Sequence, residues 1–253
     1  MILNRNTILP AAPAAKPVQY ALKALHRDFD RVFTDTAAPG GRILLTINDT
    51  LPAEQYTLTV DADTLLLSAA DDLGFVYGLF EISRRFLGVQ PFWFWNDQPF
   101  TVREGEKIPV GTVVESKSYK VKYRGWFVND ETLLSHWKVE RRANLPFVMA
   151  FETLLRLGGN MVIPGTGKNA VLYRRTAADM GLIITHHHAE PLGAEMFAQA
   201  YPDLEPMYSK YPEKFRALWQ AGIDAQKDMR VIWNIGFRGQ GDKPFWDDDP
   251  QYD

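Results

Sequence analysis

Hydrophobic residues recur along the chain at two spacings, and each spacing predicts one kind of element. Recurrence every three or four positions is typical of a helix with one apolar face, and alternation with polar residues is typical of a half-buried strand. For the first hundred residues the pattern gives helix 17–33, strands 42–48, 56–60 and 64–68, and helix 73–87.

The order of these elements predicts a compact α+β layer of about a hundred residues. We expect Asp71 or Asp72 to cap the second helix and Gly88 to end it. The stretch 101–117 contains glycine and proline and has little strand pattern. We therefore interpret it as the connection between two domains.

Strands and helices alternate from about residue 120 onward. The pattern gives strands 123–128, 160–163, 182–187 and 231–236, separated by helices 146–157, 169–180 and 212–229. This alternation predicts parallel strands that are joined by right-handed crossovers.

Two fold classes contain such units. A doubly wound sheet usually has a glycine-rich phosphate loop after its first strand, but here the acidic run 129–131 stands at that place. A (β/α)₈ barrel fits better, although a whole barrel takes roughly 250 residues. We predict an α/β protein with a small α+β domain, residues 1–115, and the first half of a TIM-type barrel, residues 116–253.

About four βα units are present in this second part, which is half of what a closed barrel requires. We therefore expect either a fragment or a half-barrel that associates with a partner. Open strand edges and exposed apolar faces favour association, so a homodimer is one expected state.

All four predicted parallel strands are followed by polar residues, at 129–131, 164–166, 186–190 and 238–242. In a (β/α)₈ barrel the chemistry takes place in the loops that follow the strands. Polar sequence at several such ends predicts one site that is built from several loops.

Asp130 and Asp242 follow the first and the fourth of these strands. Paired carboxylates cleave glycosidic bonds, because one protonates the leaving oxygen and the other activates water or attacks. The alternative is that each aspartate caps the helix or turn after its strand. Arg238 is suited to grip a substrate carboxylate in bidentate fashion, or to pair with Asp242, and the two roles are compatible.

The run His186-His187-His188 suggests a metal site, with Glu190 as a further ligand. Along a strand successive side chains alternate between faces, so at most His186 and His188 point the same way. The chain has no His-Glu-x-x-His spacing. We favour binding of a polar substrate over a metal, and expect one or two of these histidines to be structural.

Charge and composition exclude several classes of protein. The formal net charge of −3 gives no reason to expect a nucleic-acid partner. No apolar run reaches the roughly 18 residues of a membrane span. The chain has no cysteine, which excludes disulfides and thiolate sites. Residues 1–5 lack the order of a signal peptide, so we expect a cytoplasmic protein or one whose leader has been removed.

Five stretches resemble known glycoside hydrolases. Residues 74–82 are similar to the non-catalytic N-terminal domain that precedes the barrel in several of these enzymes. The barrel part resembles glycoside hydrolase family 115, the α-glucuronidases of xylan breakdown. Its matching stretches are 125–131, 155–160, 187–191 and 236–242, of which the last, with its Arg-Gly-x-Gly-Asp run, is the most specific.

The resemblance implies an inverting hydrolase that removes glucuronic acid, or its 4-O-methyl form, from the side chains of a polysaccharide or oligosaccharide. It implies no metal or other cofactor, and a secreted or periplasmic location for the intact protein. The implied catalytic residues are Asp130, Asp242 and Glu190, and the implied substrate-binding residues are Asn129, His187, His188 and Arg238, the last of which would meet the uronic carboxylate.

Because only about four βα units are present, we expect these residues alone to have little or no hydrolase activity. Two alternatives stay open. One is a carbohydrate-binding or degenerate barrel module without chemistry. The other is a different barrel hydrolase that uses a histidine-bound metal.

Overall fold

The structure is a computed structural model, and it describes residues 1–11, 15–134, 136–236, 238, 241 and 243–252. The chain divides into two compact units. Unit 1 comprises Met1–Arg124 and Glu152–Asn160, and unit 2 comprises Gly125–Phe151 and Met161–Asp253. The two units are therefore interleaved in sequence.

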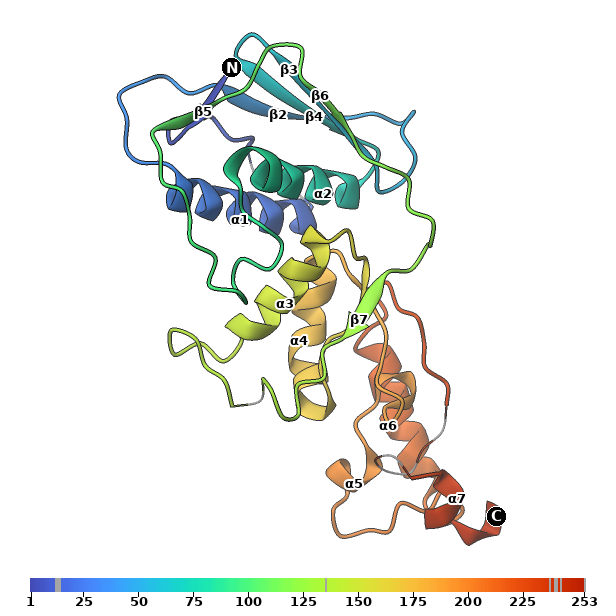
Figure 1. Ribbon diagram of the computed structural model, residues 1–253. Coiled ribbons are helices and arrows are strands. Elements are labelled where there is room, and N and C mark those ends of the chain that lie inside the picture. The colour runs from blue at the N-terminus through green and yellow to red at the C-terminus, as the bar shows by residue number, and fades with distance from the viewer. Residues whose placement is uncertain (12–14, 135, 237, 239–240, 242, 253) are drawn as a thin grey trace. The chain divides into compact units, whose positions relative to one another are not determined.

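Unit 1 contains a four-stranded sheet of order β2-β4-β3-β6 (Figure 1). The pairing of β2 with β4 is parallel, and the other two pairings are antiparallel. Leu58, Leu65 and Leu67 point to one face of the sheet and are almost fully buried there. The strands are β2 (Arg42–Ile47), β3 (Tyr56–Asp61), β4 (Thr64–Ala69) and β6 (Val113–Glu115).

Two helices lie side by side against this sheet, α1 (Lys16–Val32) and α2 (Asp72–Ile82) (Figure 1). The side chain of Asp71 accepts a hydrogen bond from the backbone N–H of Gly74 at 2.8 Å, which confirms Asp71 as the cap. One π-helical turn continues α2 to Gly88, which has a φ of 77°. The predicted end of this helix is thereby confirmed, since glycine adopts such a φ without strain.

The stretch 101–117 is not the connection that its composition suggested. It contains β5 (Gly105–Lys107), which pairs with β1 (Ile2–Asn4), and it contains β6, which forms an edge of the main sheet by pairing with β3. Each of these strands has only three residues, which is too short for alternation to reveal.

A network of buried charges joins α1 to the C-terminal half of α3 (Leu145–Arg156) inside unit 1. Asp28 lies 2.5 Å from Arg156, and Glu152 lies 2.8 Å from Arg156 and 2.6 Å from Arg27. Burial favours the neutral acid, but the two arginines outweigh it and lower the pKa of Glu152 to about 2. The network therefore depends on each charge having its partner.

Unit 2 contains three parallel strands, β7 (Gly125–Phe127), β8 (Met161–Ile163) and β9 (Ile183–Ile184). The predicted fourth strand is reduced to one parallel bridge, between Ile184 and Val231. The described residues form no closed barrel.

The helices of unit 2 include α4 (Gly167–Asp179) and α6 (Pro212–Asp224), which confirm two predicted helices with shifted ends. Shorter helices are α5 (Phe197–Ala200), α7 (Phe245–Asp248) and the 3₁₀ turns Pro191–Gly193 and Pro250–Tyr252. In the described part of the chain, no helix has the length and apolarity that a membrane crossing requires.

We predict that Arg156→Met destabilises the protein by about 3–5 kcal/mol, because the buried carboxylates of Asp28 and Glu152 lose one of the two arginines that they share. Urea unfolding measures the effect. The control is Arg42→Met, which removes an exposed pair with Asp63 and should leave the unfolding midpoint near that of the wild type. Equal midpoints for the two variants would contradict a stabilising role of the network.

Candidate functional site

The site predicted at the ends of the parallel strands lies in unit 2. Asp130 follows β7, Thr166 follows β8, and Glu190 follows β9. The strands are parallel and paired in register, so their carboxyl ends lie at one edge of the sheet. Side chains from three separate segments can therefore meet there.

Asp130 is almost fully buried, and both of its carboxylate oxygens accept hydrogen bonds. One oxygen accepts from the backbone N–H of Thr166 at 2.7 Å and from the Thr166 hydroxyl at 3.2 Å. The other accepts from the side-chain amide of Asn169. At Gly165, which has a φ of 140°, a Cβ would lie 3.1 Å from the Asp130 carboxylate, so a side chain there would crowd this group. The position of this carboxylate is thus fixed from several directions.

Glu190 is the second buried carboxyl group, and its Oε1 accepts a hydrogen bond from the backbone N–H of Gly167 at 2.5 Å. Burial raises the pKa of Glu190 to about 7, and the negative charges of Asp130 and Glu131 act in the same direction. The Gly167 hydrogen bond and the charge of Arg174 lower this pKa but do not cancel the rise. Glu190 therefore exchanges its proton near neutral pH.

The start of α4 holds both carboxyl groups. Thr166 is the N-cap of this helix and Gly167 is its first residue, so the two N–H groups that bind Asp130 and Glu190 are consecutive. The first N–H groups of a helix have no partner inside the helix, and the helix dipole favours negative charge there. One helix terminus thus brings together carboxyl groups that are 60 positions apart in the sequence.

The turn that carries Glu190 is held by one other segment of the chain, at Asn234, through two hydrogen bonds. Leu192, with a φ of 57°, donates its backbone N–H to the carbonyl oxygen of Asn234 at 2.7 Å. The side-chain amide of Asn234 donates to the carbonyl oxygen of His187 at 2.8 Å. Such a φ strains a leucine, and these contacts compensate for the strain.

His186 contacts other residues than His187 and His188 do. Its Nε2 lies 2.8 Å from Oε1 of Gln226, whose amide nitrogen donates to the carbonyl oxygen of Gly222 at 2.9 Å. The Gln226 oxygen therefore faces the ring, so His186 carries its hydrogen on Nε2. Burial lowers the pKa of His186, which favours the neutral ring.

The predicted alternation of the histidines is wrong. The strand β9 ends at Ile184, so the histidine run lies in coil and period-two geometry does not apply to it. The ring of His187 lies 3.9 Å from that of His188 and 5.3 Å from that of Phe127, between centroids. His187 and His188, not His186 and His188, are therefore neighbours.

The remaining predicted site residues differ in their exposure to solvent. Asn129 and His188 are exposed, and His187 and Arg238 are half-buried. Asp242 lies outside the described residues. The roles assigned to these residues stay predictions.

The sequence and the structure were compared with known proteins. The model of glycosyl hydrolase family 115 matches residues 116–252, which is more than half of the chain. The chain belongs to glycosyl hydrolase family 115. A search of curated proteins gives no match.

Solved structures with a similar fold include another protein of family 115, a 4-O-methyl-α-glucuronidase with specificity for decorated arabinogalactans. It has a TM-score of 0.70 and 21% identity, and the match covers 98% of this chain and 38% of that one. A chitobiase from Flavobacterium johnsoniae has a TM-score of 0.54 and 15% identity, with 98% of this chain and 44% of that one covered. The chain thus spans less than half the length of either protein.

In this family 115 chain, sequence reasoning missed the residues that hold the two carboxyl groups in place. The run 165–169 resembles a phosphate loop but fails its pattern, and nothing in it indicates that Asn169 binds Asp130. The polar Asn234, within a predicted strand, was a weak signal of a structural contact. The other missed residues are Arg174 and Gln226.

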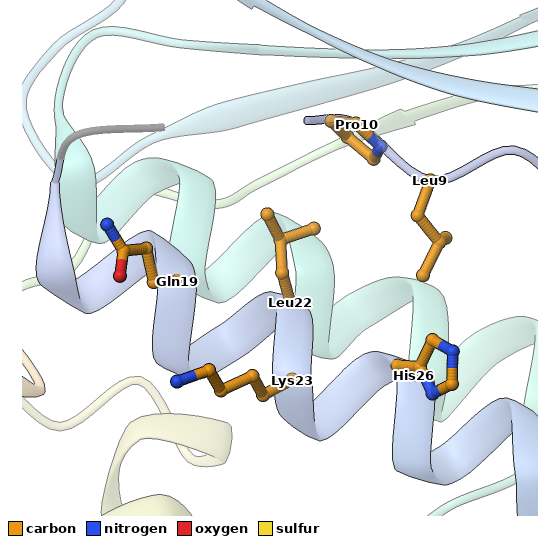
Figure 2. A pocket seen from close by; sticks show the side chains of 6 residues that line it. All are labelled: Leu9, Pro10, Gln19, Leu22, Lys23 and His26. Atoms are coloured by element: carbon orange, nitrogen blue, oxygen red, sulfur yellow. The ribbon is translucent and has the colours of Figure 1, made fainter. Parts of the chain in front are cut away.

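Among the described residues, no group of three or more His, Asp or Glu side chains is arranged to hold a metal ion. A pocket of about 340 Å³ lies elsewhere, in unit 1, between α1 and the segment of Leu9 and Pro10 (Figure 2). Lys23 and His26 lie at this pocket, which contains none of the predicted site residues.

We predict that Gly193→Ala destabilises the protein more than Gly88→Ala, by about 1–3 kcal/mol. Both glycines have a positive φ, but a Cβ on Gly193 would collide with Gln226 and lie 2.5 Å from His186, whereas a Cβ on Gly88 would meet nothing within 4 Å. Urea unfolding measures the stability of both variants. Because both carry the backbone strain and only Gly193→Ala adds a collision, the difference between them reports the collision. Equal losses would show that the packing around Gly193 is not tight.

Proposed function

We propose that this family 115 chain supplies part of the active site of a hydrolase that removes glucuronic acid or 4-O-methylglucuronic acid from polysaccharide side chains. The observation that carries the proposal is the pair of buried carboxyl groups, Asp130 and Glu190, at the start of α4. The solved family 115 structure named for 4-O-methyl-α-glucuronidase activity supports the choice of the sugar.

We also propose that residues 116–253 form the first half of a (β/α)₈ barrel and that residues 1–115 form a non-catalytic domain. The two faces of the unit 2 sheet support this. Val162 and Ile184 on one face are fully buried, whereas Ile163 and Ile183 on the other are half-buried. In a barrel, the face that carries Ile163 and Ile183 points to the interior, where side chains from the other strands would cover it.

We propose that Glu190 is the general acid, which donates a proton to the leaving group. A general acid works best when its pKa lies near the working pH, and burial raises the pKa of Glu190 to about 7. The protonated carboxyl group gives its proton to the glycosidic oxygen as the C–O bond breaks. A second carboxylate takes a proton from the water that attacks the anomeric carbon from the opposite face, so the reaction inverts and consumes one water.

Asp130 and Asp242 are the candidates for the second carboxylate. Both oxygens of Asp130 already accept hydrogen bonds, so its negative charge is held in a fixed place near Glu190 and favours the protonated form of Glu190. This arrangement supports an electrostatic role for Asp130 and leaves activation of water to Asp242.

Substrate binding is assigned to Asn129, His187, His188 and Arg238, which are all at least partly accessible. The Arg238 guanidinium is suited to bind the uronic carboxylate through two parallel hydrogen bonds. Neither a metal nor another cofactor takes part in the proposed reaction.

We predict that the polypeptide of residues 1–253 releases no measurable uronic acid, because a half-barrel does not enclose a sugar. Incubation with 4-O-methylglucuronic acid-bearing oligosaccharides and chromatography of the products measures this. Detectable release of uronic acid by this polypeptide would contradict it. Binding of the oligosaccharide without release would favour a carbohydrate-binding module.

We predict that, in the protein with its complete barrel, Glu190→Gln and Asp130→Asn each lower kcat by about 100-fold or more, since each removes a charge or a proton from the site. The control is Asp228→Asn, which changes an exposed carboxylate paired with Arg175 and should leave kcat unchanged. A Glu190→Gln variant with wild-type kcat at every pH would remove Glu190 from the mechanism.

A further inference from the structure

A buried arginine contacts the turn that carries Glu190 and has no part in the proposed reaction. Arg174 is on α4 and is about nine-tenths buried. The next residue, Arg175, is exposed and pairs with Asp228 at 2.8 Å, as surface arginines commonly do. Because burying a cation costs free energy, the position of Arg174 calls for a specific reason.

The contacts of Arg174 lead to the turn of Glu190. Its Nη1 donates to the carbonyl oxygen of Gly193 at 3.1 Å, and the backbone N–H of Gly193 donates to the carbonyl oxygen of Glu190 at 2.9 Å. The start of the same helix donates the Gly167 N–H to the Glu190 side chain. α4 therefore holds the turn at two places, its first residue and a residue two turns later.

Charged side chains from two elements act on the pKa of Glu190. Asp130 and Glu131, after β7, face it with negative charge, and Arg174 faces it with positive charge from α4. The negative charges raise the pKa of Glu190, and Arg174 lowers it. The effect is mutual, because burial lowers the pKa of Arg174 while the charge of Glu190 raises it.

We propose that Arg174 is a positioning residue that acts through Glu190: it holds the turn by its hydrogen bond to Gly193 and provides the buried positive charge that sets the pH range in which Glu190 exchanges its proton. Without this charge Glu190 would stay protonated to higher pH. It would then recover its proton more readily after each reaction cycle, but it would donate the proton less readily. The inference rests on the proposed role of Glu190 as the proton donor.

The test is a titration of Glu190 in the 253-residue polypeptide, followed by NMR of ¹³C-labelled glutamate carboxyl groups and assigned with Glu190→Gln. Arg174→Gln removes the charge but keeps a hydrogen-bond donor, so we expect the Glu190 midpoint to rise by about one pH unit. Arg174→Lys keeps the charge, so its midpoint should stay near that of the wild type. The matched control is Arg175→Gln, which should leave the midpoint unchanged.

A folded Arg174→Gln variant with an unchanged Glu190 midpoint overturns the proposal, and so does an equal shift in Arg175→Gln. A measurement on the wild type alone covers the case in which Arg174→Gln does not fold. The ¹⁵Nε resonance of Arg174 should move with the same midpoint as the Glu190 carboxyl group, and a resonance that stays constant through that range overturns the proposal.

This titration needs no substrate, so its failure is distinct from failure of the proposed function. A Glu190 midpoint that responds to Arg174, in a protein with a complete barrel that releases no uronic acid, would support the inference and reject the reaction. Release of uronic acid together with a midpoint that is indifferent to Arg174 would do the reverse.

Discussion

The site of this protein depends on the N–H groups at the start of one helix, which have no hydrogen-bond partner inside that helix. Thr166 and Gly167 present consecutive donors at the beginning of α4, and each binds a carboxyl group that comes from the end of a different strand. Parallel pairing in register brings these strand ends to one edge of the sheet, and the helix terminus then fixes the two carboxyl groups beside each other. Their closeness has an electrostatic consequence, because the charge of Asp130 and the burial of Glu190 together favour a protonated Glu190 near neutral pH.

Buried charge is used in opposite ways in the two units. In unit 1, Asp28 and Glu152 are matched by Arg27 and Arg156, so the pKa of Glu152 falls and the network acts as a rigid join between helices. In unit 2, Glu190 has a backbone N–H and the charge of Arg174, which do not offset its burial. A carboxyl group of the first kind cannot exchange protons at neutral pH, whereas one of the second kind can. This contrast separates a structural charge cluster from a candidate catalytic one.

In unit 1, long elements were predictable and short ones were not. The helices α1 and α2 and the strands β2, β3 and β4 were foreseen because their apolar periodicity extends over six or more residues. The strands β1, β5 and β6 have three residues each, and only pairing with distant partners makes them strands. For the same reason the histidine run was misjudged: β9 ends before it, so the alternation of side chains that holds in a strand does not extend to His186 and its neighbours.

The sequence alone determined which residue types follow the parallel strands, and through its resemblance it indicated the family that residues 116–252 confirm. It placed Asp130 and Glu190 in one site, because strand ends meet at one edge in any parallel sheet. Only the tertiary structure decided how these carboxyl groups are held and charged. Hydrogen bonds from Thr166 and Gly167, burial, and the cation of Arg174 all arise from segments far apart in sequence. Proton affinity depends on local solvation and neighbouring charge, and neither is present until the chain has folded.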